Sequence, residues 1–200
     1  MRRNTKVITI THMKGGIGKT MVGAILCAEL STRFGYKILV LDADDQASLS
    51  DIRKMNLRDS RYEGIKPPYE IMRIEPQVID VFIAEERSKL EEYDIVFVEL
   101  PGFFDARIAK AVQKCDCMLI PVVPNTTDNA SLIKYMTKVQ KTILDYKVAN
   151  NEEFIWYAIR NKYESKKIVH RTFKEFLESL GLDVMDSTLR LLEAYANGIQ

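Results

Sequence analysis

"THMKGGIGKTM", residues 11–21, lies between two largely apolar runs at 7–10 and 22–30. Three glycines, two lysines and a threonine stand in this short connection between a predicted strand and a predicted helix. Glycines permit backbone angles that wrap amide N–H groups around phosphate oxygens, and the following helix points the positive end of its dipole at the same place. The stretch therefore predicts a phosphate-binding loop.

The rest of the chain alternates apolar runs with longer segments of helical period, which is the pattern of a parallel sheet between two layers of helices. We expect strands at 6–11, 37–41, 94–100, 118–123 and 154–159, with weaker ones near 69–74 and 183–185. We expect helices at about 19–34, 77–91, 104–114, 128–146, 166–180 and 187–197, and an irregular segment at 56–70. The fold class is α/β, with a mostly parallel central sheet and helices on both faces.

Composition narrows the class of protein. Two hundred residues, 46% of them hydrophobic, can bury one sizeable core. The 29 basic and 28 acidic residues give a formal charge of +1, so any basic surface must be local. The three cysteines have no metal-binding spacing and fit reduced thiols. No stretch approaches the roughly 20 apolar residues of a membrane span, and we expect a cytoplasmic protein.

The loop fits most of the phosphate-loop template G-x-x-x-x-G-K-[ST]. In that template the lysine contacts the β- and γ-phosphates and the hydroxyl ligates Mg²⁺, roles that fall here to Lys19 and Thr20. The template would place glycine at position 13, where this chain has Met13. The expected nucleotide contacts are Gly15, Gly16, Ile17, Gly18, Lys19, Thr20 and Met21.

"KGGIGKT", residues 14–20, resembles the deviant Walker A motif of the ParA/MinD family of dimerising ATPases. The resemblance implies a single three-layer P-loop NTPase domain over 1–200, with ATP and Mg²⁺ as cofactors. It also implies that Lys14 crosses a dimer interface to the phosphates bound by the partner subunit. A second cation supplied in trans makes completion of the active site depend on dimerisation.

"LDADDQASLS", residues 41–50, resembles the D-x-D-P-Q segment of the same family. The resemblance implies that Asp44 orients the attacking water and helps to hold hydrated Mg²⁺, while Asp42 supports the loop or the metal's outer shell. Asp45 stands where the family usually has proline. The catalytic residues that the resemblance implies are Lys14, Lys19 and Asp44.

"YDIVFVELPG", residues 93–102, matches the Walker B region, where a buried strand leads to an acidic residue. The acid here is Glu99 in place of the usual aspartate, and the extra methylene moves the carboxylate by about 1.5 Å. The implied metal-binding set is Thr20, Asp44 and Glu99. We still expect nucleotide binding with glutamate at this position, but the sequence does not predict the rate of hydrolysis.

Two later segments also resemble functional loops of the family. Pro101 and Gly102 fit a loop that senses the γ-phosphate, and the phenylalanines at 103–104 either transmit its state to the dimer face or pack in the core. Asn161 stands where relatives present polar groups to the adenine, although a plain loop turn would account for it as well.

Among the family's branches, a short chain without an amino-terminal helix-turn-helix extension is similar to the small plasmid-partition ParA proteins. This implies an ATP-dependent homodimer that binds DNA non-specifically and segregates plasmid or chromosomal DNA with a ParB-like centromere-binding partner protein. Such a protein would be nucleoid-associated in a bacterium or archaeon. The ending "STLRLLEAYANGIQ" has one arginine, so no membrane-binding helix is expected, and the last helix of the relatives is expected to be absent.

The cations concentrate between 134 and 174, where ten Lys and Arg residues stand against four Asp and Glu residues, an excess of six. A run of this kind is ordinarily the solvated face of a helix. The resemblance favours DNA binding instead, with contacts expected from Lys166, Lys167, Arg171 and Lys174.

Two other functions remain open. Glu99 and Asp45 depart from the family pattern, which would suit a low-turnover, nucleotide-dependent protein-interaction switch of the same fold. A ligase or synthetase could use the same loop on a small metabolite, but it would need a polar substrate pocket.

Overall fold

The computed structural model describes residues 5–46, 48–124, 126–164 and 168–190, with side chains at all of these positions except 48, 62, 87, 126–128 and 169–171. One seven-stranded sheet has the order β3-β2-β4-β1-β5-β6-β7, and every neighbouring pair is parallel. The strands are β1 (Lys6–Ile10), β2 (Ile38–Asp42), β3 (Glu70–Arg73), β4 (Ile95–Glu99), β5 (Cys117–Val122), β6 (Ile155–Tyr163) and β7 (Asp183–Arg190).

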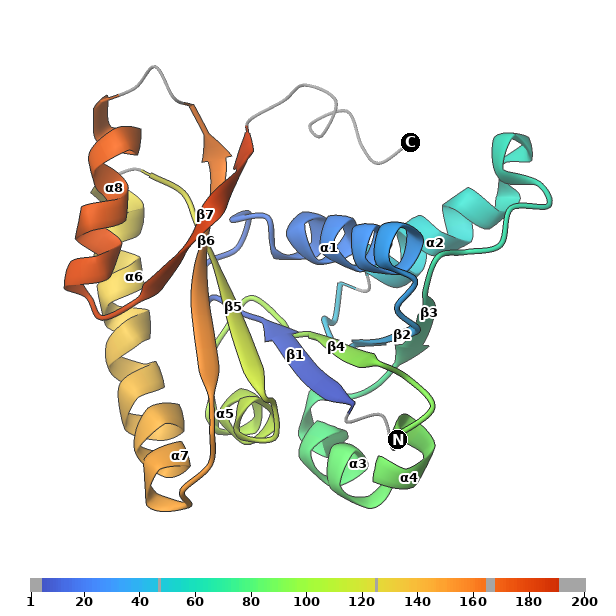
Figure 1. Ribbon diagram of the computed structural model, residues 1–200, viewed down its shortest axis with the longest axis horizontal. Coiled ribbons are helices and arrows are strands. Elements are labelled where there is room, and N and C mark those ends of the chain that lie inside the picture. Colours follow the sequence, from blue (N-terminus) through green and yellow to red (C-terminus); the bar gives the residue numbers. More distant parts are fainter. Residues whose placement is uncertain (1–4, 47, 125, 165–167, 191–200) are drawn as a thin grey trace.

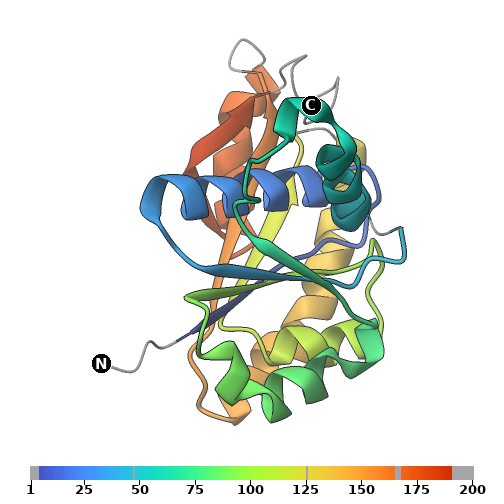
Figure 2. The ribbon, with the colours of Figure 1, turned by 90° about the vertical axis from the view of Figure 1, so that its right-hand side faces the viewer.

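Helices cover both faces of the sheet (Figures 1 and 2). The helices are α1 (Lys19–Phe34), α2 (Ser48–Arg58), α3 (Ile79–Glu85), α4 (Arg87–Leu90), α5 (Ala106–Gln113), α6 (Thr126–Val139), α7 (Asp145–Ala149) and α8 (Ile168–Ser179), with a π-helical turn at Gln140–Leu144. Helices α1 and α2 lie on one face, and α3 to α8 lie on the other. The predicted three-layer α/β fold is confirmed.

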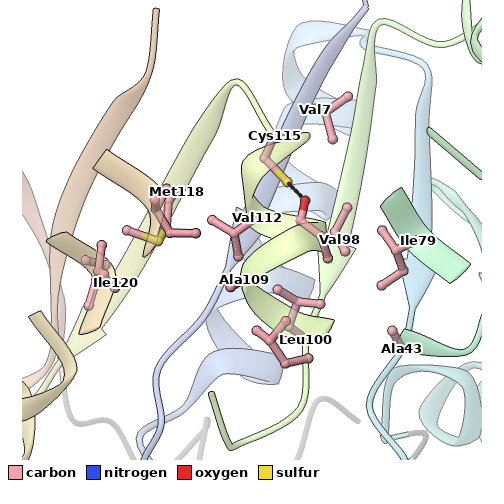
Figure 3. Packing of buried hydrophobic residues seen from close by; sticks show 14 of the residues in the cluster. Val7, Ala43, Ile79, Val98, Leu100, Ala109, Val112, Cys115, Met118 and Ile120 are labelled. Carbon is pink, nitrogen blue, oxygen red and sulfur yellow. Dashed lines mark hydrogen bonds between the residues drawn. The ribbon is translucent and has the colours of Figure 1, made fainter. Parts of the chain in front are cut away.

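The central strands are buried on both faces because helices cover both sides of a parallel sheet. Every residue of β2 and β4 is buried, as their continuous apolar runs require. Figure 3 shows the larger core cluster, where Val98 and Met118 of the sheet pack against Val112 of α5. In the same cluster the Cys115 thiol donates to the Ala111 carbonyl at 3.4 Å. All three cysteines are free, as expected.

Two sequence predictions at the sheet edges are wrong. Helix α2 occupies 48–58, where we predicted no helix and an irregular segment from 56 onward. Its Ser, Asp and Asn residues give a weak helical pattern, and Leu49 is its one fully buried apolar side chain among the described residues. The helix expected at 187–197 is wrong at 187–190, where β7 continues. Thr188 and Arg190 pair with β6, whose open edge supplies backbone partners that local propensity cannot anticipate. Residues 191–197 of that prediction lie outside the described part.

The strand order places the candidate site. The order reverses at β1, which lies between β4 and β5, so the loops at the carboxyl ends of these strands lie at the topological switch point of the sheet. The register aligns Glu99 with both Ile10 and Asp42. The loops that follow β1, β2 and β4 therefore leave the sheet at one level.

Candidate functional site

The loop between β1 and α1 has the shape of a phosphate-binding loop. Gly16 and Gly18 have φ angles of 72° and 94°, which a side chain would strain, and Gly18 caps the amino terminus of α1. Lys19 opens the helix and is only 7% exposed. Backbone amides at this helix start, with a buried cation beside them, fit the phosphates of a nucleotide.

Thr20 and Glu99 are joined by a hydrogen bond. The Thr20 hydroxyl donates to Glu99 Oε1 at 2.8 Å, while Oε2 is buried with no hydrogen-bond partner among the described residues. Burial raises the pKa of Glu99 to about 8, against the lowering effect of the Thr20 hydrogen bond and of the Lys19 charge. A buried carboxylate oxygen left unpaired is the arrangement expected of a group that receives a cation or its water shell.

A glycine in α1 makes room for this longer acid. A Cβ atom built on Gly23 would lie 3.2 Å from Glu99 Oε2 and 2.9 Å from the Phe97 ring. The helix can therefore approach β4 only because position 23 has no side chain. No feature of the sequence singles out Gly23 for this role, because glycine also occurs inside helices at positions where nothing packs closely.

The loop after β4 lies against the phosphate loop, and its role in sensing the γ-phosphate stays a prediction. A Cβ atom on Gly102 would lie 3.4 Å from Lys19 Nζ and 3.8 Å from the Gly15 Cα. For the next two residues we predicted either core packing or a role at the dimer face, and their environments differ. Phe104 packs edge-on against Tyr135 at 5.4 Å, whereas Phe103 is 37% exposed with the Arg107 guanidinium 5.5 Å from its ring centre.

The loop after β2 carries Asp44 half-buried, with Oδ1 accepting from the Gln46 amide. Asp42 is fully buried and accepts from the amide and hydroxyl of Ser50. Arg73, at the end of β3, donates to Asp42 Oδ1 at 3.1 Å and to the Asp44 carbonyl at 2.6 Å. The sequence did not single out Arg73, since only the pairing of β3 with β2 brings it to this loop.

Lys14 is half-buried, and its amide donates to His12 Nδ1 at 3.0 Å. His12 is 1% exposed, and its ring lies 5.1 Å from that of Tyr135. Burial, together with the charges of Lys19 and Lys14, lowers the pKa of His12 to about 4. The imidazole is therefore neutral and can accept the Lys14 N–H. The sequence offered no signal for this contact beyond the spacing of the two residues.

Asn161, near the end of β6, also contacts the phosphate loop. It is buried, and its Nδ2 donates to the Ile17 carbonyl at 2.9 Å. A Cβ atom on Gly18 would lie 2.3 Å from that nitrogen, so Gly18 is required for this approach. The predicted contact of Asn161 with adenine stays a prediction.

The residues fit Mg²⁺ bound together with a nucleotide. No cluster of three or more His, Cys, Asp and Glu side chains able to hold a metal occurs in the described part of the chain. Magnesium uses one or two protein ligands and takes the rest from phosphates and water, so such a cluster is not needed. Thr20, Glu99 and Asp44 supply a hydroxyl and two carboxylates, and the Asp44 charge acts on Glu99 closely enough to raise its pKa.

Residues 8–199 match the family described as the CobQ/CobB/MinD/ParA nucleotide binding domain. The chain belongs to this family. The ParA/MinD resemblance read from residues 14–20 is confirmed.

Three similar proteins illustrate how far this chain differs from its relatives in sequence. Maintenance of carboxysome distribution protein A of Halothiobacillus neapolitanus is 24% identical over 196 residues, covering 96% of this chain and 82% of that protein. A plasmid partition protein of Borrelia burgdorferi B31 bound to AMPPNP has a TM-score of 0.69 at 18% identity, covering 98% of this chain and 92% of that one. MinD of Pyrococcus horikoshii OT3 complexed with Mg-ADP has a TM-score of 0.68 at 19% identity, covering 97% and 84%. The two structures show a shared fold.

Of the predicted DNA contacts of this ParA/MinD-family chain, the structure describes the side chain of Lys174 alone, and DNA binding stays a prediction. Lys166 and Lys167 lie outside the described residues, as does the side chain of Arg171. Lys174 donates to Asp186 Oδ1 at 3.1 Å and lies 3.9 Å from Glu178. It is thus partly neutralised by its neighbours.

Other cations of the basic run are also engaged. Lys147 is buried and pairs with Glu152 at 2.7 Å, and Arg160 is buried and donates to the Asp186 carbonyl at 2.9 Å. Among the described cations of 134–174, Lys147 and Arg160 are therefore not part of an exposed basic surface. No helix in the described ranges has the length and apolar character needed to cross a bilayer.

Proposed function

We propose that this chain is a Mg²⁺-dependent partition ATPase that dimerises with ATP, binds DNA non-specifically and positions a cargo through a partner protein. The observation that carries the proposal is the meeting of the phosphate loop with the end of β4 and the loop that follows it. The Thr20 hydroxyl donates to Glu99, and the Lys19 charge acts on the same carboxyl. Gly102 lies against Lys19 and Gly15. That arrangement suits binding a nucleotide triphosphate and sensing its last phosphate.

In the proposed site each side chain has one task. Lys19 and the loop amides bind the phosphates, and Lys14 contributes its charge to the partner subunit's nucleotide. Asp44, on the loop held by Arg73, orients the attacking water. Bound Mg²⁺ would neutralise phosphate charge, held through Thr20 with Glu99 behind it. Gly102, packed on Lys19 and Gly15, carries the state of the γ-phosphate toward Phe103 at the surface.

DNA binding is proposed to use α6 as well as the predicted α8 surface. Lys134, Lys138 and Lys141 are exposed, and none of the three forms an ion pair with another described residue. Their spacing of four and three residues places them on one side of α6 and its π-helical continuation. A dimer would present this row of charges twice, which favours a polyanion over a small acidic ligand.

The cargo is proposed from the relatives' names alone. The Halothiobacillus relative is named for carboxysome distribution and the Borrelia protein for plasmid partition. We propose that a ParB-like or equivalent adaptor binds this chain, stimulates hydrolysis and connects it to plasmid, chromosome or organelle. The adaptor would bind the homodimer that this chain forms with ATP.

The test is a fluorescence anisotropy titration of duplex DNA of arbitrary sequence with ATP and Mg²⁺, and again with ADP. We expect ATP-dependent binding that weakens steeply with salt, by about 0.9 in log–log slope for each phosphate neutralised. A Lys134→Ala/Lys138→Ala/Lys141→Ala variant should bind more weakly with a shallower slope. The matched control, Lys66→Ala/Lys89→Ala/Lys110→Ala, removes the same charge from exposed sites elsewhere and should bind normally. A second variant, Lys166→Ala/Lys167→Ala/Arg171→Ala, tests the sequence prediction.

A low-turnover interaction switch is the second candidate, favoured by Glu99. A carboxyl with a pKa near 8 is largely protonated at neutral pH, which would slow a reaction that needs its charge. ATP-dependent dimerisation without steady-state hydrolysis, with or without DNA, would favour the switch. DNA-stimulated turnover would favour the partition ATPase.

A further inference from the structure

The end of β6 contacts the phosphate loop at two consecutive carbonyls. Asn161 Nδ2 donates to the Ile17 carbonyl at 2.9 Å, and Lys162 Nζ donates to the Gly16 carbonyl at 3.1 Å. The two contacts join residues 144 and 146 positions apart in the chain. One short segment therefore clamps the middle of the loop.

An unusual backbone makes this clamp possible. Successive side chains of a strand point to opposite faces, so Asn161 and Lys162 could not both reach the loop from a regular strand. Lys162 has a φ of 51°, in the left-handed region that a residue with a side chain adopts at a cost. The Asn161 Oδ1 accepts the Lys162 amide at 2.9 Å, which stabilises the turn. The strained backbone at Lys162 therefore allows both side chains to contact one loop.

Holding a carbonyl fixes the amide beyond it. In a planar trans peptide the C=O and the next N–H point in opposite directions. The Gly16 carbonyl therefore orients the Ile17 N–H, and the Ile17 carbonyl orients the Gly18 N–H, both away from β6. Gly18, at the start of α1, leaves the space that the Asn161 amide occupies.

We propose that Asn161 and Lys162 are positioning residues that hold the carbonyls of Gly16 and Ile17, and so set the loop amides in place for the phosphates of the nucleotide. The clamp pre-orders the loop, so binding costs less conformational entropy. This role of Asn161 is distinct from a contact with the base, because it acts on the loop backbone. The inference rests on the nucleotide binding in the proposed function, and it is independent of DNA binding and of hydrolysis.

Lys162 gives the sharper test, because Asn161 also has a predicted base contact. Lys162→Gly removes the ammonium group while accepting the left-handed backbone, and Lys162→Asn does the same should the glycine variant fold poorly. Lys162→Arg keeps the charged donor. The matched control is Asn151→Gly, because Asn151 has the same φ of 51° in the turn before β6, at the opposite end of the strand.

The first readout is calorimetric binding of Mg-ADP to the full chain. We expect about fivefold weaker binding for Lys162→Gly, affinity within about twofold of the parent for Lys162→Arg, and no change for Asn151→Gly. The second readout is amide hydrogen exchange of residues 15–18 in the absence of nucleotide. It should be faster in Lys162→Gly and unchanged in the control.

Unchanged affinity together with unchanged exchange in Lys162→Gly would overturn the clamp, as would an equal loss of affinity in Asn151→Gly. Failure of the parent chain to bind Mg-ADP would instead contradict the proposed function. The exchange measurement still reports on the clamp in that case, because it needs no nucleotide.

Discussion

Thr20 and Glu99, 79 residues apart, are joined by a 2.8 Å hydrogen bond from the hydroxyl to Oε1. The longer side chain of glutamate thus still reaches the residue predicted to ligate Mg²⁺. Its second oxygen is buried beside α1, in space that Gly23 leaves open. Glu99, predicted to be the Walker B acid, therefore contacts Thr20 at the start of α1. Its protonation state then decides how much negative charge it offers to a cation.

The charge of Glu99 should make Mg²⁺ binding depend on pH. Because burial raises its pKa to about 8, the carboxylate form grows as pH rises through that value. The gain in ADP affinity on adding Mg²⁺, measured by calorimetry, should therefore increase between pH 7 and 9. Glu99→Gln keeps an acceptor for Thr20 but cannot ionise, so its gain should be small and flat with pH. An equally steep rise in Glu99→Gln would assign the pH dependence to another group.

Shortening the acid tests its effect on turnover. Glu99→Asp should preserve or raise steady-state ATP hydrolysis if the extra methylene impairs the site. The measurement is phosphate release with and without DNA. A large loss of turnover would show that the hydroxyl contact requires the length of glutamate.

The two loop lysines should separate binding from assembly. Lys19→Ala should abolish nucleotide binding, because Lys19 is the buried cation at the start of α1. Lys14→Ala should leave ADP binding by the monomer largely intact and remove ATP-dependent dimerisation and turnover. Calorimetry and light scattering measure the two effects. Normal dimerisation and hydrolysis by Lys14→Ala would contradict the role in trans.

Asp44 should be needed for hydrolysis and not for affinity. Asp44→Ala removes the carboxylate while leaving its carbonyl, which accepts from Arg73, so the loop should keep its position. The variant should accumulate an ATP-bound dimer with turnover reduced by about a hundredfold or more. Gel filtration with ATP and a phosphate-release assay check this. Unchanged turnover would remove Asp44 from the catalytic residues.

His12 should make stability fall in mild acid. Its pKa is lowered to about 4 in the folded chain and returns to about 6.5 on unfolding, so the unfolded chain binds the proton first. The free energy of unfolding is therefore unaffected by this group above pH 6.5. It decreases as pH falls toward 4, by about 3 kcal/mol in all. His12→Asn can still accept the Lys14 amide but does not titrate. Urea denaturation should show a smaller loss in that variant, and parallel pH curves would contradict the assignment.

Local sequence determined the phosphate loop and the central strands. The loop needs glycines, a lysine and a hydroxyl in one short stretch, and β2 and β4 are continuous apolar runs bounded by polar residues. Each of these patterns depends on residues that are close together in the chain. Hydrophobic periodicity and turn-forming residues are therefore enough to predict them. The ParA/MinD family could be read from residues 14–20 for the same reason.

Contacts between distant segments could be found only in the tertiary structure. Asn161 and Lys162 reach the loop, and Arg73 reaches Asp44, because parallel strands bring their carboxyl ends to one edge of the sheet. The sequence shows an excess of six cations at 134–174 without distinguishing Lys147 from the others, but folding buries Lys147. Burial and pairing depend on what the rest of the chain places around a side chain, and residue order alone does not specify those neighbours.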